Sequence, residues 1–227
     1  IAHEINTPLG IILGYVQLLL DDTDPDRQIH ADLEMIEKQT KICRKIVSDL
    51  LRFSRHSEST ITLLDINQSI EESVKVLEHT YNLDMITINR NYGFNLPNVK
   101  GDKDKFSQIF MNLISNAHDA IGTHGTINIK TNYDKKNDEL IILLGDTGSG
   151  IPPEKIDRIF NPFYTTKSLG KGTGLGLSVT FGIIKDLGGS IEVESPPSNV
   201  INNEFNNPQS TVFIIRLPAV SEEASIT

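Results

Sequence analysis

Two apolar heptad patterns in the first 50 residues constrain the fold more than any other feature of the sequence. Apolar side chains recur in alternating steps of four and three, first at Ile5, Leu9, Ile12, Val16 and Leu19, and then at Ile29, Leu33, Ile36, Thr40, Cys43, Val47 and Leu50. Residues 21–25 separate the patterns with turn-forming chemistry, so we expect an antiparallel helical hairpin. Two helices cannot bury both stripes alone. We therefore expect a homodimer that forms a four-helix bundle, with Cys43 in its core.

The composition is that of an ordinary globular protein, and it excludes several classes of function. The 21 Lys+Arg against 30 Asp+Glu give a net charge of −9, which argues against nucleic acid as the main partner. One cysteine excludes an intramolecular disulfide and a multi-cysteine metal site. The sequence has no apolar run of about 18 residues, so we expect no membrane contact within this fragment. We expect a cytoplasmic piece of a longer protein, with any membrane anchor in upstream segments.

After a polar linker at residues 54–60, the pattern changes to a mixture of strands and helices. Strands are expected at 61–66, 85–91, 126–131, 140–144, 190–194 and 211–217, and helices at 67–81, 102–121 and 177–187. Asp65 or Asn67 is expected to cap the first of these helices. The fold class is therefore α+β, with a hairpin domain at 1–56 and a second domain at 57–220. An Asn-, Pro- and Ser-rich stretch at 195–210 predicts a mobile loop, and 221–227 a disordered tail.

His3 and its neighbours form the first candidate reactive site. Glu4 can orient the imidazole and accept its proton, which makes the other ring nitrogen a better nucleophile. Thr7 lies one turn later on the same helical face, and Pro8 should bend the helix beside the histidine. An isolated helical histidine is usually a packed or surface residue, but this combination predicts a phosphoacceptor.

A second polar group lies on the helix expected at 102–121. Gln108, Asn112, Asn116 and Asp119 share one face of it, separate from the apolar face. The amide oxygens of Asn112 and Asn116 can hold Mg²⁺, which takes few protein ligands and completes its shell with phosphate and water. The same spacing also fits a solvated surface.

Two glycine-rich segments have the chemistry of a nucleotide site. Asp146 ends an apolar strand, where a carboxylate can accept a hydrogen bond from an adenine amino group, and Gly148 and Gly150 would let the backbone approach the base. Asp-x-Gly-x-Gly is also a common turn. Downstream, alternating glycines lead into a helix and predict phosphate binding, in a segment made of Gly170, Lys171, Gly172, Thr173, Gly174, Leu175 and Gly176. The segment matches neither a P-loop nor Gly-x-Gly-x-x-Gly.

Between these segments, residues 160–167 combine aromatic anchors with a polar stretch. They predict a lid over the nucleotide that includes Phe163, with Lys167 or Lys171 near the phosphates. A surface loop packed by its phenylalanines is the simpler alternative.

In order and spacing, these motifs resemble the transmitter core of two-component sensor histidine kinases. Residues 3–8 are similar to the H box of the HisKA dimerisation domain. The other boxes follow as the N box at 112–120, the G1 box at 146–150, the F box at 160–163 and the G2 box at 172–176. The resemblance covers about residues 1–218. It implies a dimeric hairpin that carries the phosphohistidine, and an α/β sandwich ATP-binding domain of the GHKL (Bergerat) type.

The resemblance also implies roles for individual residues. His3 would be the phosphoacceptor, Glu4 its acid/base neighbour, and Thr7 the residue that places water when a partner is dephosphorylated. The nucleotide site would comprise Asn116 as the Mg²⁺ ligand, Asn112 as its support, Asp146 as the adenine-binding carboxylate, and Gly148, Gly150, Gly172, Gly174 and Gly176 around the nucleotide. Asn6 stands where many relatives carry Arg or Lys, and Asp119 where many carry Lys. The segment 165–171 is a short lid.

The function expected from this resemblance is ATP- and Mg²⁺-dependent phosphorylation of His3, followed by transfer to an aspartate of a response regulator receiver domain. One alternative is a GHKL ATPase that drives conformational work, which leaves the His-Glu-x-x-Thr-Pro pattern unexplained. A second is a degenerate kinase that serves as a dimeric binding scaffold, against which the intact His3, Asn116 and Asp146 argue. A serine kinase of the same superfamily is the third.

Overall fold

The computed structural model describes residues 2–25, 27–54, 60–81, 85–167, 172–205 and 207–220, without the side chains of 2–4, 45–46, 48–54 and 79–81. The chain divides into two units, Ile1–Ser57 with Asn161–Leu175 and Glu58–Phe160 with Gly176–Thr227. The domain boundary expected near residue 56 stays a prediction. The expected linker is described only at its ends, and the expected tail lies outside the described residues. No helix in the described ranges has the length and apolar character to cross a bilayer.

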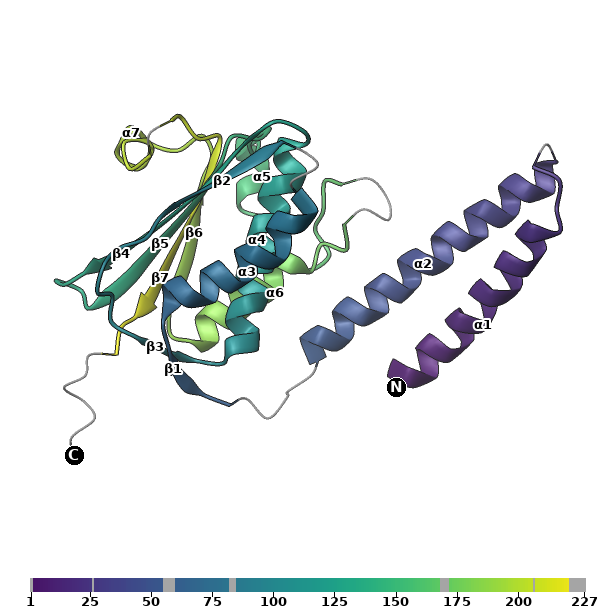
Figure 1. The fold of residues 1–227 in the computed structure, drawn as a ribbon, viewed down its shortest axis with the longest axis horizontal. Helices are drawn as coiled ribbons and strands as arrows, with labels where there is room; N and C mark the ends of the chain where they lie inside the picture. Colours follow the sequence, from purple (N-terminus) through teal and green to yellow (C-terminus); the bar gives the residue numbers. More distant parts are fainter. Residues whose placement is uncertain are drawn as a thin grey trace. The chain divides into compact units, whose positions relative to one another are not determined.

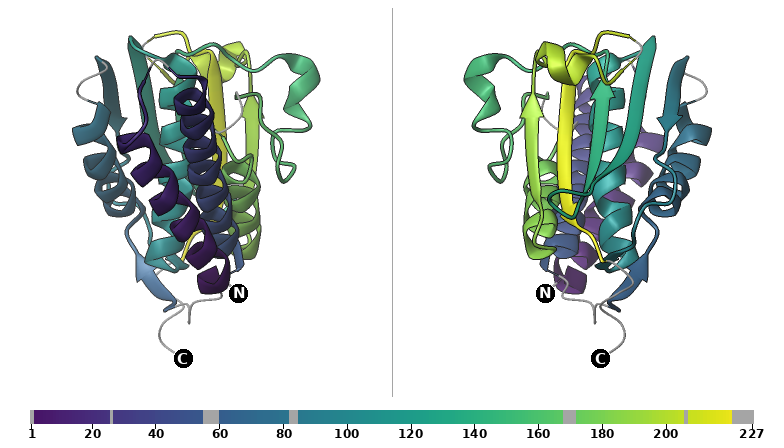
Figure 2. Two further views of the ribbon diagram at one scale, coloured as in Figure 1. Left: turned by 90° about the vertical axis from the view of Figure 1, so that its right-hand side faces the viewer. Right: turned by 90° about the vertical axis from the view of Figure 1, so that its left-hand side faces the viewer.

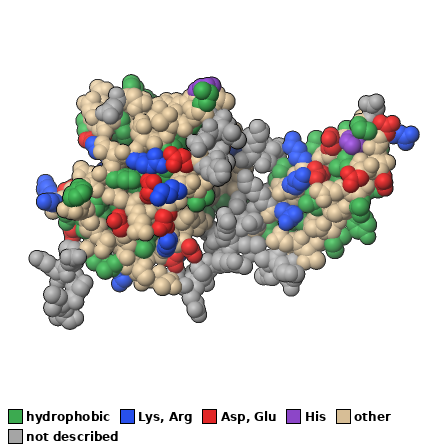
Figure 3. All heavy atoms as spheres, in the orientation of Figure 1, with side chains coloured by type: hydrophobic (Ala, Val, Ile, Leu, Met, Phe, Trp, Pro, Cys, Tyr) green, Lys and Arg blue, Asp and Glu red, His purple; other side chains and the backbone are tan. Residues whose placement is uncertain are grey.

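The first unit contains an antiparallel hairpin of two long helices, α1 (Ala2–Asp21) and α2 (Gln28–Ser54) (Figure 1). Val16, Leu33 and Thr40 are buried between them. Much of the remaining apolar stripe stays exposed in the single chain, and Figure 3 shows apolar side chains along the α1 edge of the hairpin. The exposed side chains are Ile5, Ile11, Ile12, Tyr15, Leu18, Leu19, Ile29, Met35 and Ile36.

Cys43 is exposed in the single chain. It is therefore not a core residue of one hairpin, and its place in the core of the expected bundle stays a prediction. The physical reason for its exposure is that one hairpin has one internal seam. Within one hairpin, only the part of each apolar stripe that faces the other helix is buried. Leu33 is buried in this way, while Ile36, the next residue of the stripe, is 46% exposed.

The second unit is built on a five-stranded mixed sheet, with the strand order β2-β4-β5-β7-β6. Its strands are β2 (Ile86–Asn91), β4 (Gly125–Asp134), β5 (Glu139–Asp146), β6 (Ser190–Glu194) and β7 (Thr211–Pro218). The β2–β4 pair is parallel and the other pairs are antiparallel. Two strands of three residues, β1 (Thr62–Leu64) and β3 (Val99–Gly101), form a separate antiparallel pair.

Three helices cover one face of this sheet, as the views in Figures 1 and 2 agree. They are α3 (Ile66–Tyr81), α4 (Lys103–Ile121) and α6 (Gly176–Asp186). The core lies between the layers, because α4 buries Phe106, Phe110 and Leu113 while alternate residues of β5, such as Leu140 and Leu144, face them. This α/β sandwich confirms the expected α+β fold class.

Two aspartates cap the N-termini of α3 and α4. Asp65 accepts hydrogen bonds from the backbone N–H groups of Asn67 and Gln68 at 2.8 and 3.2 Å, so Asp65 is the cap of α3 and Asn67 is not. Asp102 caps α4 in the same way, accepting from Asp104 at 2.8 Å. Each carboxylate also lies at the positive end of its helix dipole.

Residues 195–210 do not form the mobile loop that their composition predicts. They contain a short helix, α7 (Asn199–Asn202), on the sheet face opposite α3, α4 and α6 (Figure 1). Ile201 and Phe205 pack against a cluster of Leu143, Val212 and Ile214 on that face. The polar composition conceals these two apolar anchors, and the outer sheet face that receives them is a tertiary feature.

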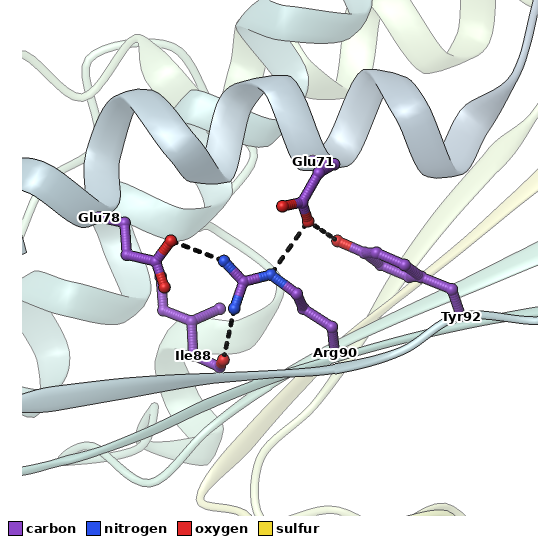
Figure 4. A network of polar contacts seen from close by, with 5 residues as sticks. All are labelled: Glu71, Glu78, Ile88, Arg90 and Tyr92. Atoms are coloured by element: carbon purple, nitrogen blue, oxygen red, sulfur yellow. Dashed lines mark hydrogen bonds and ion pairs between the residues drawn. The ribbon is translucent and has the colours of Figure 1, made fainter.

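Arg90 joins the edge strand β2 to helix α3 (Figure 4). Its Nε donates to Glu71 at 3.0 Å, its Nη2 donates to Glu78 at 2.7 Å, and its Nη1 donates to the carbonyl of Ile88. The hydroxyl of Tyr92 donates to the same oxygen of Glu71 at 3.1 Å. Burial, followed by the charge of Glu71, raises the pKa of Tyr92, so the phenol keeps its proton and remains a donor.

Candidate functional site

Asp146 ends β5 and is 2% exposed. Its Oδ1 accepts a hydrogen bond from the backbone N–H of Gly148 at 2.8 Å. Burial raises the pKa of Asp146 to about 6, and the Gly148 N–H opposes that rise. A carboxylate this far from water is costly unless it has a further partner, which makes it a candidate ligand-binding group.

The other carboxylate oxygen of Asp146, Oδ2, has no hydrogen-bond donor within the described part of the chain. No fully buried side-chain nitrogen or oxygen there lacks a partner, so Oδ2 reaches an accessible surface. It can therefore accept a hydrogen bond from a ligand, such as the exocyclic amino group of adenine.

The Asp146 loop (residues 146–151) is held against the end of α4. The backbone N–H of Ser149 donates to the carbonyl of Ala120 at 3.0 Å. A Cβ on Gly148 would lie 2.6 Å from the carbonyl carbon and 2.7 Å from the oxygen of Ala120, so a side chain here would meet rigid backbone. Only glycine permits this approach.

A threonine that sequence reasoning missed also holds the loop. Thr147 Oγ1 accepts from the backbone N–H of Thr126 at 2.9 Å, and the Thr147 N–H donates to the Thr126 carbonyl at 3.2 Å. The Asp146 loop is thereby joined to the start of β4 as well as to α4. The partners lie about 20 positions apart along the chain, and no local pattern marks them.

Asn112 links α4 to the start of α6. Its Nδ2 donates to the carbonyl of Gly176 at 3.0 Å and to Oγ1 of the buried Thr180 at 3.3 Å. A Cβ on Gly176 would lie 3.5 Å from Cγ of Asn112, an ordinary contact. Asn112 therefore fixes the helix that follows the glycine-rich segment.

Asn116 lies on α4 one turn after Asn112 and one turn before Ala120. It is therefore located between the start of α6 and the Asp146 loop, and it is partly buried. Asp119 is exposed near His118, whose Nδ1 lies 3.6 Å from Oδ1 of Asp119. On the predicted polar face, the two asparagines are thus partly buried and Asp119 is exposed.

The donor set suits a metal ion that is bound mainly by a nucleotide. Within the described ranges, no group of three or more His, Cys, Asp and Glu side chains is placed to hold a metal. An amide such as that of Asn116 is a hard oxygen donor of the kind Mg²⁺ accepts, with phosphate and water as the remaining ligands.

The segment 161–175 belongs to the first unit and folds back on itself. Gly174 has φ +68°, and a Cβ there would lie 2.4 Å from the carbonyl carbon of Phe163. A Cβ on Gly172 would lie 2.8 Å from Oγ1 of Thr165. Phe163 itself is 61% exposed with φ +65°, Thr173 is partly buried, and Leu175 is buried. The glycines at 172 and 174 thus serve close packing within the segment.

The remaining predicted site residues are placed as follows. His3, Glu4 and Thr7 all lie on α1, where Thr7 is exposed and the side chains of His3 and Glu4 are outside the described residues. Lys167 is partly buried and its N–H donates to Thr165 Oγ1 at 3.2 Å, while Lys171 lies outside the described residues. The structure brings together Asp146, Gly148, Gly150, Asn112, Asn116 and Gly176 in the second unit. It does not place the first-unit residues relative to them.

Two protein-family models match this sequence. Residues 1–59 match the His Kinase A (phospho-acceptor) domain, and residues 101–221 match the family described as histidine kinase-, DNA gyrase B-, and HSP90-like ATPase. Sensor histidine kinase ZraS of Salmonella typhimurium is 30% identical over 223 residues, which are 98% of this chain and 45% of that protein. The chain thus spans less than half the length of this relative.

Two solved structures share the fold. Full-length ShkA in complex with AMPPNP has a TM-score of 0.70 at 22% identity, covering 97% of this chain and 45% of that one. Histidine kinase ThkA in complex with response regulator protein TrrA has a TM-score of 0.67 at 26% identity, covering 96% of this chain and 60% of that one.

Proposed function

We propose that this chain, which belongs to the sensor histidine kinases, transfers the γ-phosphoryl group of ATP to the imidazole of His3. The resulting phosphohistidine then donates the group to an aspartate of a response regulator. Binding of ATP is supported by the match to an ATPase family over residues 101–221. The phosphoacceptor role is supported by the match of residues 1–59 to a phospho-acceptor domain.

The observation that carries the nucleotide part of the proposal is the buried Asp146 carboxylate. Its Oδ1 is occupied by the Gly148 N–H, whereas Oδ2 has no donor within the described residues. An adenine amino group would supply that donor. Gly148 has no side chain that would obstruct the approach of the base.

The phosphate part of the proposal rests on α4 and α6. The N-terminus of α6 offers backbone N–H groups and a positive dipole end to an anion, and Asn112 holds that end in place. Asn116 would hold Mg²⁺, which neutralises charge on the phosphates when it is bound. The family resemblance also implies roles near the phosphates for Gly172, Gly174, Lys167 and Lys171.

In the transfer step, the lone pair of one imidazole nitrogen of His3 attacks the γ-phosphorus in line. A P–N bond forms, the bond from the γ-phosphorus to the β,γ-bridging oxygen breaks, and ADP leaves. Glu4 accepts the proton from the other ring nitrogen, so the imidazole does not accumulate an unfavourable charge. The proposed role of Thr7 is to place water when the phosphorylated regulator is hydrolysed.

The proposed partners are a receiver domain and a second copy of this chain. ThkA, which is 26% identical to this chain, was solved with a response regulator protein. The exposed apolar side chains of α1 and α2, such as Ile12 and Leu18, would be covered in a four-helix bundle. We propose the cytoplasm as the location, because ATP is the donor.

The test is incubation of the full chain with γ-labelled ATP and Mg²⁺. We compare the wild type with His3→Gln, which lacks the acceptor, and with Asp146→Asn, which lacks the adenine-binding carboxylate. His124→Gln is the matched control, because His124 is exposed and contacts only its neighbour Thr123 among the described residues. Label that survives alkali, is lost in acid and is absent from the first two variants supports the proposal.

Three other outcomes would overturn the histidine kinase proposal. If ATP is hydrolysed and no label stays on the protein, the chain acts as a GHKL ATPase. If the wild type does not bind ATP at all, it is a binding scaffold. Alkali-labile label would instead indicate a serine kinase.

A further inference from the structure

Ser195, the residue that follows β6, contacts the Asp146 loop from outside it. Its side chain is buried, with the residue 5% exposed. The Ser195 Oγ accepts a hydrogen bond from the backbone N–H of Ile151 at 2.8 Å and donates one to the carbonyl of Ser210 at 2.8 Å. Oγ1 of Thr211 lies 3.3 Å away. One hydroxyl therefore joins two segments of the chain.

Ser210 is in turn hydrogen-bonded to the backbone of Asp146. The backbone N–H of Ser210 donates to the carbonyl of Asp146 at 2.7 Å, and the next residue, Thr211, is opposite Asp146 in the β5–β7 ladder. Hydrogen bonds thus run from Ile151 through Ser195 and Ser210 to the backbone of Asp146. The Ser195 side chain, which lies outside the Asp146 loop, thus connects the two ends of that loop through hydrogen bonds.

The position of Ser210 is itself held by its neighbour. Gln209 is buried and lies against Gly145, where a Cβ would be 2.6 Å from its Oε1. That Oε1 accepts from Nδ2 of Asn128 at 3.0 Å. The segment that presents Ser210 is therefore anchored on the outer face of the sheet.

At the far end of the Asp146 loop, the Ser195 hydroxyl is the hydrogen-bond acceptor that the described residues give to the Ile151 N–H. Gly150 has φ +73°, a left-handed conformation, and a Cβ there would lie 3.3 Å from Ser195 Oγ. The residues from 147 to 152 lie outside helices and strands, and α5 (Pro153–Ile156) begins directly after them. The near end, by contrast, is held by Ala120 and Thr126.

We propose that Ser195 is a positioning residue for nucleotide selection, which holds the Asp146 loop in the conformation that accepts adenine. The inference rests on the proposed function, because it requires ATP at Asp146. Ser195 does not itself touch the base or the phosphates. Its hydroxyl holds the backbone at Ile151, and the loop then keeps Oδ2 of Asp146 aimed at the adenine amino group.

This role predicts a loss of selectivity as well as affinity. Adenine offers an amino group at the position where guanine carries a carbonyl oxygen, and a carboxylate accepts from the first and repels the second. Removing the Ser195 hydroxyl loosens the loop, so ATP loses its specific contact. GTP does not make that contact, so its binding affinity should fall less than that of ATP.

The experiment measures equilibrium binding of ATP and of GTP to the full chain, as wild type, Ser195→Ala and Ser195→Thr. Ser73→Ala is the matched control. Ser73 is 1% exposed, and its Oγ donates to the carbonyl of Ser69 at 3.1 Å within α3, so the same hydroxyl is deleted from an equally buried site. Thermal unfolding without nucleotide reports the stability of each variant.

We expect Ser195→Ala to weaken ATP binding about tenfold, the effect of losing one buried hydrogen bond, while GTP binding changes less than threefold. Ser73→Ala keeps the wild-type ATP preference even if it lowers the unfolding temperature equally. Ser195→Thr retains the hydroxyl and restores ATP affinity.

Four results would overturn the inference. Unchanged ATP affinity in Ser195→Ala would leave the ATP site proposed above standing and remove the role of Ser195. Equal loss for ATP and GTP, or failure of Ser195→Thr to restore binding, would show a general structural role. A wild type that binds no ATP would overturn the proposed function, and this inference with it.

Discussion

The side-chain amide of Asn112 donates from Nδ2 to the backbone carbonyl of Gly176 at 3.0 Å, which joins the middle of α4 to the first residue of α6. The second acceptor, Oγ1 of Thr180, lies one turn further along α6. Both contacts use the amide nitrogen of Asn112 to hold α6 against α4. Asn112 thus acts on the proposed phosphate site by placing the helix that begins there.

Replacing Asn112 with alanine is therefore expected to weaken ATP binding about tenfold and to destabilise the fold by about 1–2 kcal/mol, because the amide hydrogen bonds to the Gly176 carbonyl and to Thr180 Oγ1 are lost. The control is Asn137→Ala, which removes an amide that donates to Asp134 at the exposed β4–β5 turn. Calorimetric titration with ATP and denaturant unfolding measure both effects. Equal binding by the two variants would contradict this role.

Gly148→Ala adds one methyl group where no space exists. The new Cβ would lie 2.6 Å from backbone carbon of Ala120, and backbone cannot rotate away as a side chain can. We expect a loss of about 1–3 kcal/mol in unfolding free energy and no detectable ATP binding, since the loop must move away from α4.

The same glycine-to-alanine change in Gly182 of α6 is the control for Gly148→Ala. No atom lies within 4 Å of the Cβ position there, and the residue is inside a helix. Alanine should stabilise this position by about 0.5–1 kcal/mol and leave ATP binding unchanged. A Gly148→Ala variant that binds ATP normally would show that the approach of the loop to Ala120 is dispensable.

The raised pKa of Asp146 predicts a pH-dependent stability in the absence of nucleotide. The folded carboxyl has a pKa of about 6 against 3.8 for the ordinary group, so the folded state holds its proton more tightly than the unfolded state. Stability from this group is fully present below pH 3.8 and is lost as pH rises through 6. At neutral pH the charged, buried Asp146 therefore costs stability.

Asp146→Asn is expected to raise the unfolding free energy at pH 7.5, on the order of 2 kcal/mol, and to lose that advantage by pH 4. The asparagine oxygen can still accept from Gly148, but its amide group presents a donor to the adenine amino group, so ATP binding falls. Urea unfolding across this pH range is the measurement. A variant less stable than the wild type at both pH values would show that the carboxylate is not a cost to the fold.

Periodicity predicted the long elements because their patterns extend over several turns or alternations, as in α4 and β5. It missed β3 (Val99–Gly101) and α5 (Pro153–Ile156), which are too short to show a period. The error at residues 195–210 has a different cause. Ile201 and Phe205 are isolated in a polar stretch, and only the sheet face beneath them explains their packing.

Within the candidate site, the sequence reveals groups whose chemistry is local. Asp146 and Gly148 are two residues apart, and their hydrogen bond follows from that spacing. Partners distant in sequence are not visible in this way, because Asn112 and Gly176 are 64 residues apart and Ser195 and Ile151 are 44 apart. The contacts that support the site could therefore be identified only from the folded structure.

The exposed stripe of the hairpin gives the last prediction. Ile5, Ile12 and Leu19 recur at intervals of seven along α1 and are 42%, 44% and 51% exposed, whereas Val16 in the same heptad pattern is 6% exposed. In a symmetric bundle each of these side chains is buried in both copies, so a charge at one position is placed twice in the interface.

Ile12→Asp is therefore expected to weaken the dimer by about 3–6 kcal/mol, or 10²- to 10⁴-fold in dissociation constant, because two buried isoleucines are lost. Gly10→Asp is the control, since Gly10 lies on the face of α1 away from Ile12 with no atom near its Cβ position. Sedimentation velocity across protein concentrations measures both. ATP binding should be the same in both variants, because Asp146 and Asn112 belong to the other unit. A wild type that sediments as a monomer at micromolar concentration would contradict the proposed bundle.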